Sequence, residues 1–199
     1  MSIISQALPR RAIVTDDPLR ARMLSAHHLE YSTLVYETGD ILVYSGSYKE
    51  VPIALASTGF GDSAVLSFLR ELKGLGVAEV VYIGGCISTT EQYKLRTVVL
   101  AAGSSQSMLT RARDAAWQFE IPTTIQAVLP PDSVYPEEGC IIDSVTDALY
   151  EQARIDGIEA LSILTISENT KTGEKMEEHE RRSRFYTASR LVFEMLAME

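Results

Sequence analysis

The sequence predicts an α/β fold with three layers, in which helices cover both faces of a mixed, mostly parallel central sheet. Short apolar runs alternate with segments whose apolar residues recur at helical spacing, a pattern typical of parallel strands joined by helices. The first unit has a clear boundary, because the strand-like run 12–15 is followed by Asp16-Asp17-Pro18, a strong helix start. No repeat, linker or low-complexity segment interrupts the chain, so we expect residues 1–199 to form a single domain.

Each predicted element rests on a local signal. The first helix is expected to reach about Glu30, with Leu19, Met23 and Leu24 on its buried side. Further strands are predicted where apolar runs lie between turn residues, at 34–37, 41–45, 51–57, 80–83, 95–102, 123–129 and 161–166. Further helices are predicted at 63–73, 108–119 and 145–155, and as one long helix within 174–198.

The composition excludes several classes of protein. The 199 residues include 18 basic and 27 acidic side chains, a net charge of −9, which argues against nucleic-acid and anionic-membrane partners. No apolar run approaches the roughly 18 residues that span a bilayer. The N-terminal charges follow a short apolar stretch, the reverse of a secretory signal. Cys86 and Cys140 form no C-x-x-C pair and are interpreted as reduced thiols, so we expect a cytoplasmic protein.

Common cofactor motifs are weak in this sequence. Residues 59–64 match the dinucleotide-binding pattern G-x-G-x-x-A, but Glu79 begins the next strand, whereas the acid of that fingerprint should end it. We therefore interpret 59–64 as a tight turn from a strand into a helix. His27, His28 and His179 are interpreted as surface residues, and neither a metal nor an organic cofactor is expected.

Six segments, taken in order, resemble motifs of one enzyme family. They are D-D-P-L-R (16–20), S-G-S-Y-K (45–49), S-T-G-F-G (57–61), Y-I-G-G-C (82–86), K-L-R (94–96) and the run 161–168 with the tail after it. The nucleoside phosphorylase/uridine phosphorylase family has, respectively, G-D-P-x-R, T-G-x-Y-K-G, x-T-G-M-G-x-P-S, R-x-G-[ST]-C-G, x-L-x-D-x-V and T-x-S-D. Because their order and spacing cover nearly the whole chain, the protein is identified as a shortened and divergent member of this family.

The resemblance implies an activity and an assembly. The family cleaves the N-glycosidic bond of nucleosides with phosphate as the nucleophile, and a related branch of methylthioadenosine/adenosylhomocysteine nucleosidases uses water. A nucleoside or nucleobase is therefore the implied ligand, with phosphate as a possible co-substrate. The implied assembly is a homo-oligomer, either a dimer or a trimer of dimers, and the alternative is a hetero-oligomer with a paralogue.

Carried over residue by residue, the phosphate site of the family is incomplete. Arg20 matches the arginine of the first motif, and Gly85 stands where the family has Ser or Thr. Asp16 replaces the glycine of the first motif, and Tyr82 replaces the strand-end arginine. A further family arginine, supplied by a neighbouring subunit, falls near Gly39. Asp16 has two open interpretations, an altered phosphate site or the N-cap of the following helix.

The ribose and base sites are altered as well. The family motif V-E-M-E aligns with 142–145, so a valine replaces the glutamate that binds the ribose hydroxyls, while an aspartate keeps a carboxylate at the preceding acidic position. Cys86 has a second interpretation, as a buried structural thiol. The resemblance carries five residues over to this site: Cys86, Val134, Asp143, Ser144 and Val145.

Glu168 and Arg181 are the predicted catalytic pair. Glu168 replaces the base-contacting aspartate of the family, and Arg181 aligns with the helix arginine that assists this acid. Such a pair would donate a proton to the leaving base. The additional methylene of glutamate displaces the acid by about 1 Å, which can lower a rate roughly 100-fold.

These replacements lead to three functional hypotheses. The first is a family member with lost or weakened phosphorolysis, since two site loops, at 102–108 and 135–142, are also shortened. The second is an active phosphorylase or nucleosidase with a rearranged site centred on Glu168, Arg181 and Arg20. The third is a structural subunit that pairs with an active paralogue and keeps an apolar strand at 41–46 as an interface.

Overall fold

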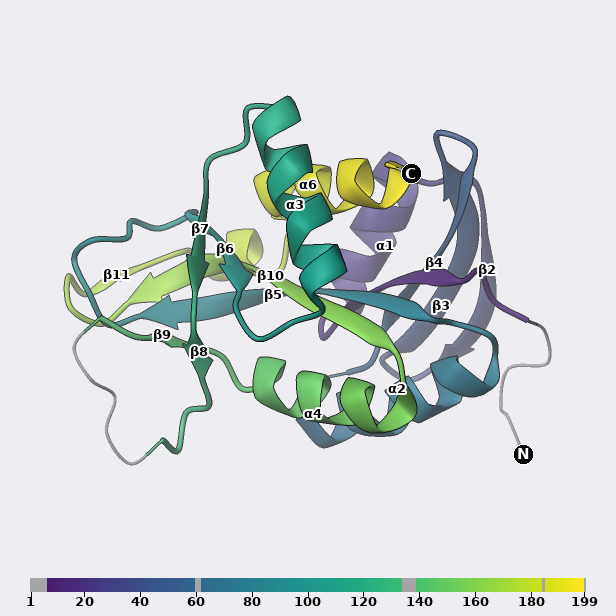
Figure 1. Cartoon of the computed structure of the whole chain (residues 1–199), viewed down its shortest axis with the longest axis horizontal. Helices are drawn as coiled ribbons and strands as arrows, with labels where there is room; N and C mark the ends of the chain where they lie inside the picture. Colours follow the sequence, from purple (N-terminus) through teal and green to yellow (C-terminus); the bar gives the residue numbers. More distant parts are fainter. Residues whose placement is uncertain (1–6, 60–61, 134–138, 184, 199) are drawn as a thin grey trace.

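The central sheet runs through the whole protein in the strand order β2-β3-β4-β1-β5-β10-β6-β7 (Figure 1). The computed structural model describes residues 7–59, 62–133, 139–183 and 185–198. The strands of this path are β1 (Arg11–Thr15), β2 (Glu30–Thr38), β3 (Ile41–Tyr48), β4 (Val51–Ser57), β5 (Glu79–Ser88), β6 (Val98–Ala101), β7 (Thr123–Gln126) and β10 (Glu159–Asn169). Short strands β8 (Val128–Leu129), β9 (Ile141–Ile142) and β11 (Glu174–Lys175) extend it.

The middle of the sheet is parallel and its flanks are antiparallel. Strands β4, β1, β5 and β10 pair in parallel in that order, and β6 pairs antiparallel with β10 and in parallel with β7. The hairpin β2–β3 adds two antiparallel strands to β4. The carboxyl ends of β1, β5 and β10 therefore lie at the same edge of the sheet, where α/β proteins build ligand sites.

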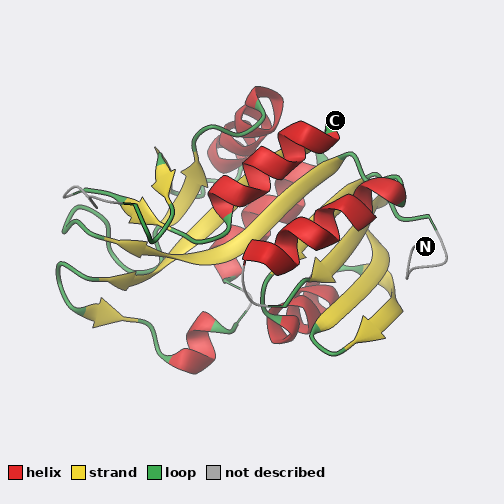
Figure 2. Cartoon of the chain, turned by 90° about the horizontal axis from the view of Figure 1, so that it is seen from below, coloured by secondary structure: helices red, strands yellow, loops and turns green. Residues whose placement is uncertain are grey.

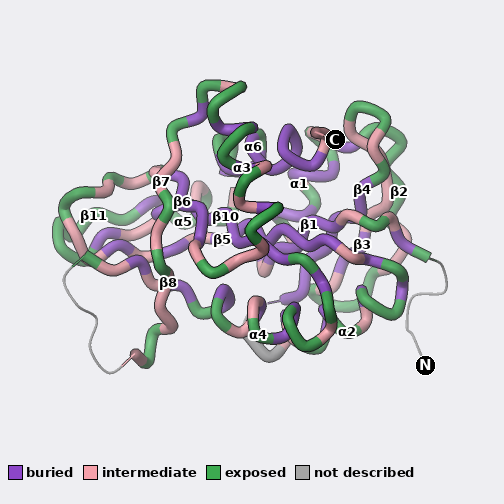
Figure 3. The backbone as a smooth tube through the Cα atoms, in the orientation of Figure 1, coloured by how far each residue is buried: buried purple, intermediate pink, exposed green. Residues whose placement is uncertain are grey.

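Helices cover both faces of this sheet (Figure 2). The helices are α1 (Pro18–His28), α2 (Asp62–Gly74), α3 (Gln106–Gln118), α4 (Thr146–Asp156), α5 (Glu178–Arg181) and α6 (Tyr186–Ala197). Two separate hydrophobic clusters form the core, one including residues of α2 and α4 and the other including residues of α1, α3 and α6. The central strands between them are buried (Figure 3). The predicted three-layer α/β fold with a mixed, mostly parallel sheet is confirmed.

Several predicted boundaries were wrong. Helix α1 ends at His28 and Glu30 begins β2, while Leu19, expected on the buried side, is 42% exposed. The long helix predicted within 174–198 is instead β11, α5 and α6, separated by turns. Phe185 breaks the helical path because its backbone is left-handed, with φ of 45°. None of the described helices is long and apolar enough to cross a membrane.

One close approach inside β5 constrains the site. Tyr82 is fully buried, and its ring folds over Gly84, two residues later on the same strand. A Cβ atom on Gly84 would lie 2.5 Å from the Tyr82 ring, closer than side chains pack. Glycine at position 84 is therefore required for Tyr82 to occupy its buried position.

We predict that Gly84→Ala destabilises the protein by about 1–3 kcal/mol, the usual cost of overpacking a core. Urea unfolding followed by circular dichroism would measure the change. Gly74→Ala is the matched control, because nothing lies within 4 Å of a Cβ at that position, and a shift within about 1 kcal/mol is expected there. Equal stability of Gly84→Ala and the wild type would contradict the packing of Tyr82.

Candidate active site

A cavity of about 570 Å³ lies at the carboxyl ends of β1, β5 and β10. Its walls come from the start of α1, the ends of β5 and β10, the segment after β9, and α5 with the turn that follows it. Six predicted site residues line it together: Arg20, Gly85, Cys86, Asp143, Ser144 and Arg181. The sheet thus brings together residues that are up to 161 positions apart in the chain.

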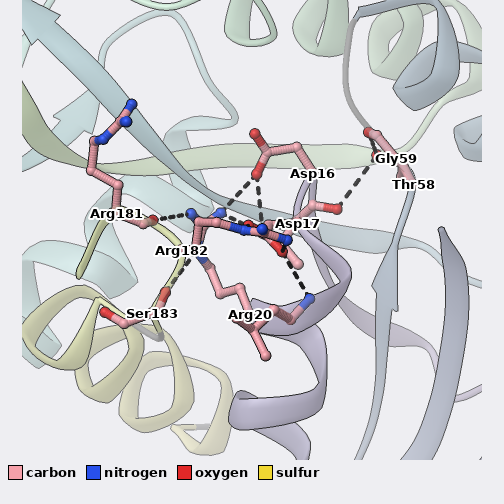
Figure 4. A network of polar contacts seen from close by, with 10 residues as sticks. Asp16, Asp17, Arg20, Thr58, Gly59, Arg181, Arg182 and Ser183 are labelled. Atoms are coloured by element: carbon pink, nitrogen blue, oxygen red, sulfur yellow. Dashed lines mark hydrogen bonds and ion pairs between the residues drawn. The ribbon is translucent and has the colours of Figure 1, made fainter. Parts of the chain in front are cut away.

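The guanidinium of Arg20 is held by acceptors of this chain on all three nitrogens (Figure 4). Its Nη1 donates to Thr15 Oγ1 at 2.8 Å and to Asp16 Oδ1 at 2.7 Å. Its Nε donates to the backbone oxygen of Ser183 at 3.0 Å, and its Nη2 donates to that of Arg181 at 2.7 Å. The residue is 4% exposed. Arg20 is therefore a buried cation whose hydrogen-bonding capacity is largely used.

The two adjacent aspartates have different roles. Asp17 is the N-cap of α1, because its carboxylate accepts a hydrogen bond from the Leu19 backbone at 2.8 Å. The same carboxylate pairs with Arg182 Nε at 2.9 Å. Asp16 pairs with Arg20, one turn later on the helix. Of the two interpretations of Asp16, the helix cap is thus wrong, and its carboxylate lies in the cavity beside the predicted phosphate-binding arginine.

Neutral groups occupy the other positions that the resemblance assigns to phosphate binding. Tyr82 is buried, and burial raises the pKa of its phenol well above 10.0, so this side chain carries no charge at neutral pH. Gly85 lines the cavity, where the Ser167 hydroxyl lies 3.0 Å from the position a Cβ would take. Gly39 lies at the β2–β3 turn and is not among the cavity-lining residues.

Asp143 is tied into the start of α4. Its Oδ2 accepts hydrogen bonds from the backbone of Val145 and from both the backbone and the hydroxyl of Thr146, at 2.7–3.2 Å. Burial raises the pKa of the Asp143 carboxyl above 3.8, and these hydrogen bonds oppose that shift. Val145 is buried in the core and does not line the cavity. Val134 lies outside the described residues.

Cys86 faces the cavity but is poorly suited to act as a nucleophile. The residue is 2% exposed, and burial raises the pKa of its thiol well above 9.0. A thiol is nucleophilic only as the thiolate. Cys86 therefore contributes a neutral surface to the cavity wall.

Glu168 and Arg181 are not brought together. A bulge between Ile166 and Glu168 interrupts the β10–β5 pairing. Ser167 then lines the cavity, whereas Glu168 pairs with Lys175 of β11 at 2.6 Å. Arg181 lines the cavity, and its Nε is buried and has no hydrogen-bond partner in the described structure.

Sequence reasoning missed several residues that line the cavity, among them Ser167, Arg182 and Phe185. Arg182 pairs with Asp17, 165 positions away in the chain. The Phe185 ring lies 4.4 Å from the Arg20 guanidinium, in cation–π contact. Among the described residues, no cluster of three or more His, Cys, Asp or Glu could hold a metal ion.

The raised pKa of Asp143 predicts a pH dependence of stability. The folded protein holds this proton more tightly than the unfolded chain, so wild-type stability falls as the pH rises through the unfolded and then the folded pKa. Asparagine has no proton to lose, so Asp143→Asn should gain stability relative to the wild type as the pH rises from about 4 towards 7.

Urea unfolding of both proteins at several pH values would measure this trend. Asp147→Asn, an exposed change in the first turn of the same helix, controls for the loss of one negative charge. A stability difference between Asp143→Asn and the wild type that stays constant, or that shrinks with rising pH, would contradict the prediction.

The arrangement defines an α/β protein of the nucleoside phosphorylase type, and comparison with known proteins agrees. The model of the phosphorylase superfamily matches residues 10–141. The chain therefore belongs to this superfamily, within the nucleoside phosphorylase family that its motifs resemble.

Relatives and solved structures extend this match over nearly the full chain. The "Purine nucleoside phosphorylase DeoD-type" of Bacillus subtilis (strain 168) is 28% identical, covering 87% of this chain and 88% of that protein. The protein of the same name from Alkaliphilus metalliredigens is 27% identical, covering 92% of each. The fold matches that of purine nucleoside phosphorylase from Toxoplasma gondii in complex with immucillin-H, with a TM-score of 0.86 at 16% identity, covering 99% of this chain and 96% of that one. Uridine phosphorylase from Vibrio fischeri gives 0.82 at 19% identity, covering 98% and 96%.

The alignment with the Bacillus relative contains segments that this chain lacks. The alignment is 205 positions long, which is more than the 199 residues of this chain. It nevertheless includes only 87% of this chain. The expected shortening of the loops at 102–108 and 135–142 stays a prediction, and residues 135–138 of the second loop lie outside the described residues.

Proposed function

We propose that this protein is a nucleoside phosphorylase-family member of nucleoside or nucleobase metabolism in which phosphorolysis is lost or strongly weakened. The observation that carries the proposal is the state of Arg20, whose guanidinium already binds the Asp16 carboxylate and two backbone carbonyls of this chain. A phosphate ion would have to displace these acceptors. It would also have to approach the carboxylate of Asp16.

Two electrostatic effects oppose phosphate binding in this cavity. Two unit charges of the same sign about 4 Å apart repel by roughly 4 kcal/mol at an effective dielectric near 20. A charge-assisted hydrogen bond contributes roughly 1.5–3 kcal/mol, and the arginine that would make such bonds at position 82 is a neutral tyrosine. Both effects weaken phosphate binding.

The proton donor expected for the leaving base is also displaced. Glu168 is held by Lys175 at 2.6 Å, and this ion pair lies on the β10–β11 hairpin instead of in the cavity. Val145, at the position of the ribose-binding glutamate, is in the core. These positions disfavour the hypothesis of an active enzyme built on Glu168 and Arg181.

The hypothesis of a structural subunit receives no support from the strand 41–46. Leu42 and Val43 are fully buried within this chain, because β3 lies between β2 and β4. The apolar character of this strand is therefore explained by the protein's own core. Continuity of the sheet and of the two helical layers supports our proposal that residues 1–199 form one domain.

An oligomer remains part of the proposal because β2 lies at the edge of the sheet and is largely exposed (Figure 1). Tyr31 is 90% exposed and Leu34 is 38% exposed on this strand. Apolar groups on an open strand edge favour pairing with another chain.

The proposal predicts that Asp16→Gly improves phosphate binding by about tenfold or more, because it removes the carboxylate that competes for Arg20. Isothermal titration with inorganic phosphate would measure this change. Asp16→Asn removes the charge while keeping the side-chain size. Asp114→Asn, exposed on α3, is the control for an equal change in net charge.

A turnover assay with inosine, adenosine and uridine completes the test. The wild type should release no base in a phosphate-dependent manner. Phosphate-dependent turnover at rates normal for an enzyme, from about 1 to 1,000 per second, would overturn the proposal. Release of base without phosphate would instead support the hypothesis of a nucleosidase.

A further inference from the structure

Among the described residues, three arginines line the cavity, and two of them are paired with carboxylates of the same chain. Arg20 pairs with Asp16 and Arg182 pairs with Asp17. The Arg181 side chain has no ion pair or hydrogen bond with any residue in the described ranges, and its Nε atom is buried without an acceptor. Burying an N–H group of a charged side chain without a partner is costly, so this position calls for an acceptor.

The backbone of Arg181 is fixed independently of its side chain. Its carbonyl oxygen accepts the 2.7 Å hydrogen bond from Arg20 Nη2, which anchors the end of α5 over the cavity. Figure 4 shows the Arg181 side chain extending away from the Arg20 guanidinium. The acid expected beside it, Glu168, is paired with Lys175. Arg181 is therefore held in place while its charge is left available.

We propose that this cavity binds a small carboxylate attached to a planar ring, with the carboxylate on Arg181. The inference rests on the proposed function, because it assumes that Arg20 is closed to phosphate. A guanidinium presents two parallel N–H groups that match the two oxygens of a carboxylate. Ser144 lines the same cavity and supplies a neutral donor, whereas the Ser167 hydroxyl already donates to the Cys86 backbone oxygen at 3.3 Å.

The remaining walls suit the ring of such a ligand. Ile87, Ile142, Pro131 and Phe185 contribute apolar surface to the cavity. Its volume of about 570 Å³ lies within the range of roughly 300–1,000 Å³ typical of small-molecule sites. A ring with one acidic substituent would thus bury its apolar part and pair its charge.

The acidic residues of the cavity restrict where a negative charge can lie. Asp16 and Asp17 are compensated by arginines, and Asp143 is compensated by the hydrogen bonds at the start of α4. Glu178 is exposed, three residues before Arg181 on α5. It disfavours any anion near it, and a planar monoanion is repelled less than a phosphate dianion.

The test compares benzoate with its neutral isostere benzamide, by titration calorimetry with the full-length protein at neutral pH. Benzoate should bind about tenfold or more tightly than benzamide, the factor that corresponds to one charge-assisted hydrogen bond. Arg181→Gln should abolish this preference, and Arg181→Lys should restore part of it. Both variants keep the backbone carbonyl that anchors α5, and Glu178→Gln should strengthen benzoate binding.

The outcomes separate this inference from the proposed function. Equal binding of benzoate and benzamide, or a benzoate preference that survives Arg181→Gln, would overturn the carboxylate site and leave the proposed function intact. A different result would overturn the proposed function. In that case, inorganic phosphate binds the wild type and competes with benzoate, and this competition is lost when Arg20 is substituted. Failure of benzoate to bind at all would contradict the inference, and a folded Glu178→Gln variant that also fails would exclude repulsion as the cause.

Discussion

The buried guanidinium of Arg20 is the constraint on which the rest of the site depends. Its three nitrogens connect the end of β1, through Thr15 and Asp16, with the end of α5 and the turn after it. They reach these through the carbonyl oxygens of Arg181 and Ser183. A buried cation without partners would destabilise the folded state by several kcal/mol. The folded protein must therefore keep these acceptors within hydrogen-bond distance of Arg20. This side chain therefore helps to hold α5 over the cavity.

Two further ion pairs hold α5 on either side of that contact. Arg182 reaches Asp17 at the start of α1, and Arg96 binds the Glu180 carboxylate through two nitrogens. The carboxylates of Asp16, Asp17 and Glu180 are thereby satisfied within the chain. The arginine that the resemblance assigns to phosphate binding is paired with Asp16, whereas the Arg181 side chain has no such pair among the described residues.

The sequence predicted the layers well because each relies on local periodicity, and it predicted the site less well because each site residue relies on contacts between distant segments. Asp16-Asp17-Pro18 marks the start of α1, but the sequence does not show which aspartate is the N-cap. That depends on the direction in which each side chain points after the end of β1. The apolar spacing around Phe185 predicts a continuous helix, but the backbone of Phe185 is left-handed. Its ring contacts the Arg20 guanidinium and lies close to Gly85. The bulge in β10 turns Ser167 toward the cavity, and alternation of residue types does not reveal a bulge.

The central claim is that Arg20 is closed to phosphate by the Asp16 carboxylate. A crystal structure of the wild-type protein soaked in inorganic phosphate tests it most directly. We predict that the Arg20–Asp16 ion pair remains intact and that no phosphate lies on the Arg20 guanidinium. Phosphate bound to Arg20, with the Asp16 carboxylate displaced, would contradict it.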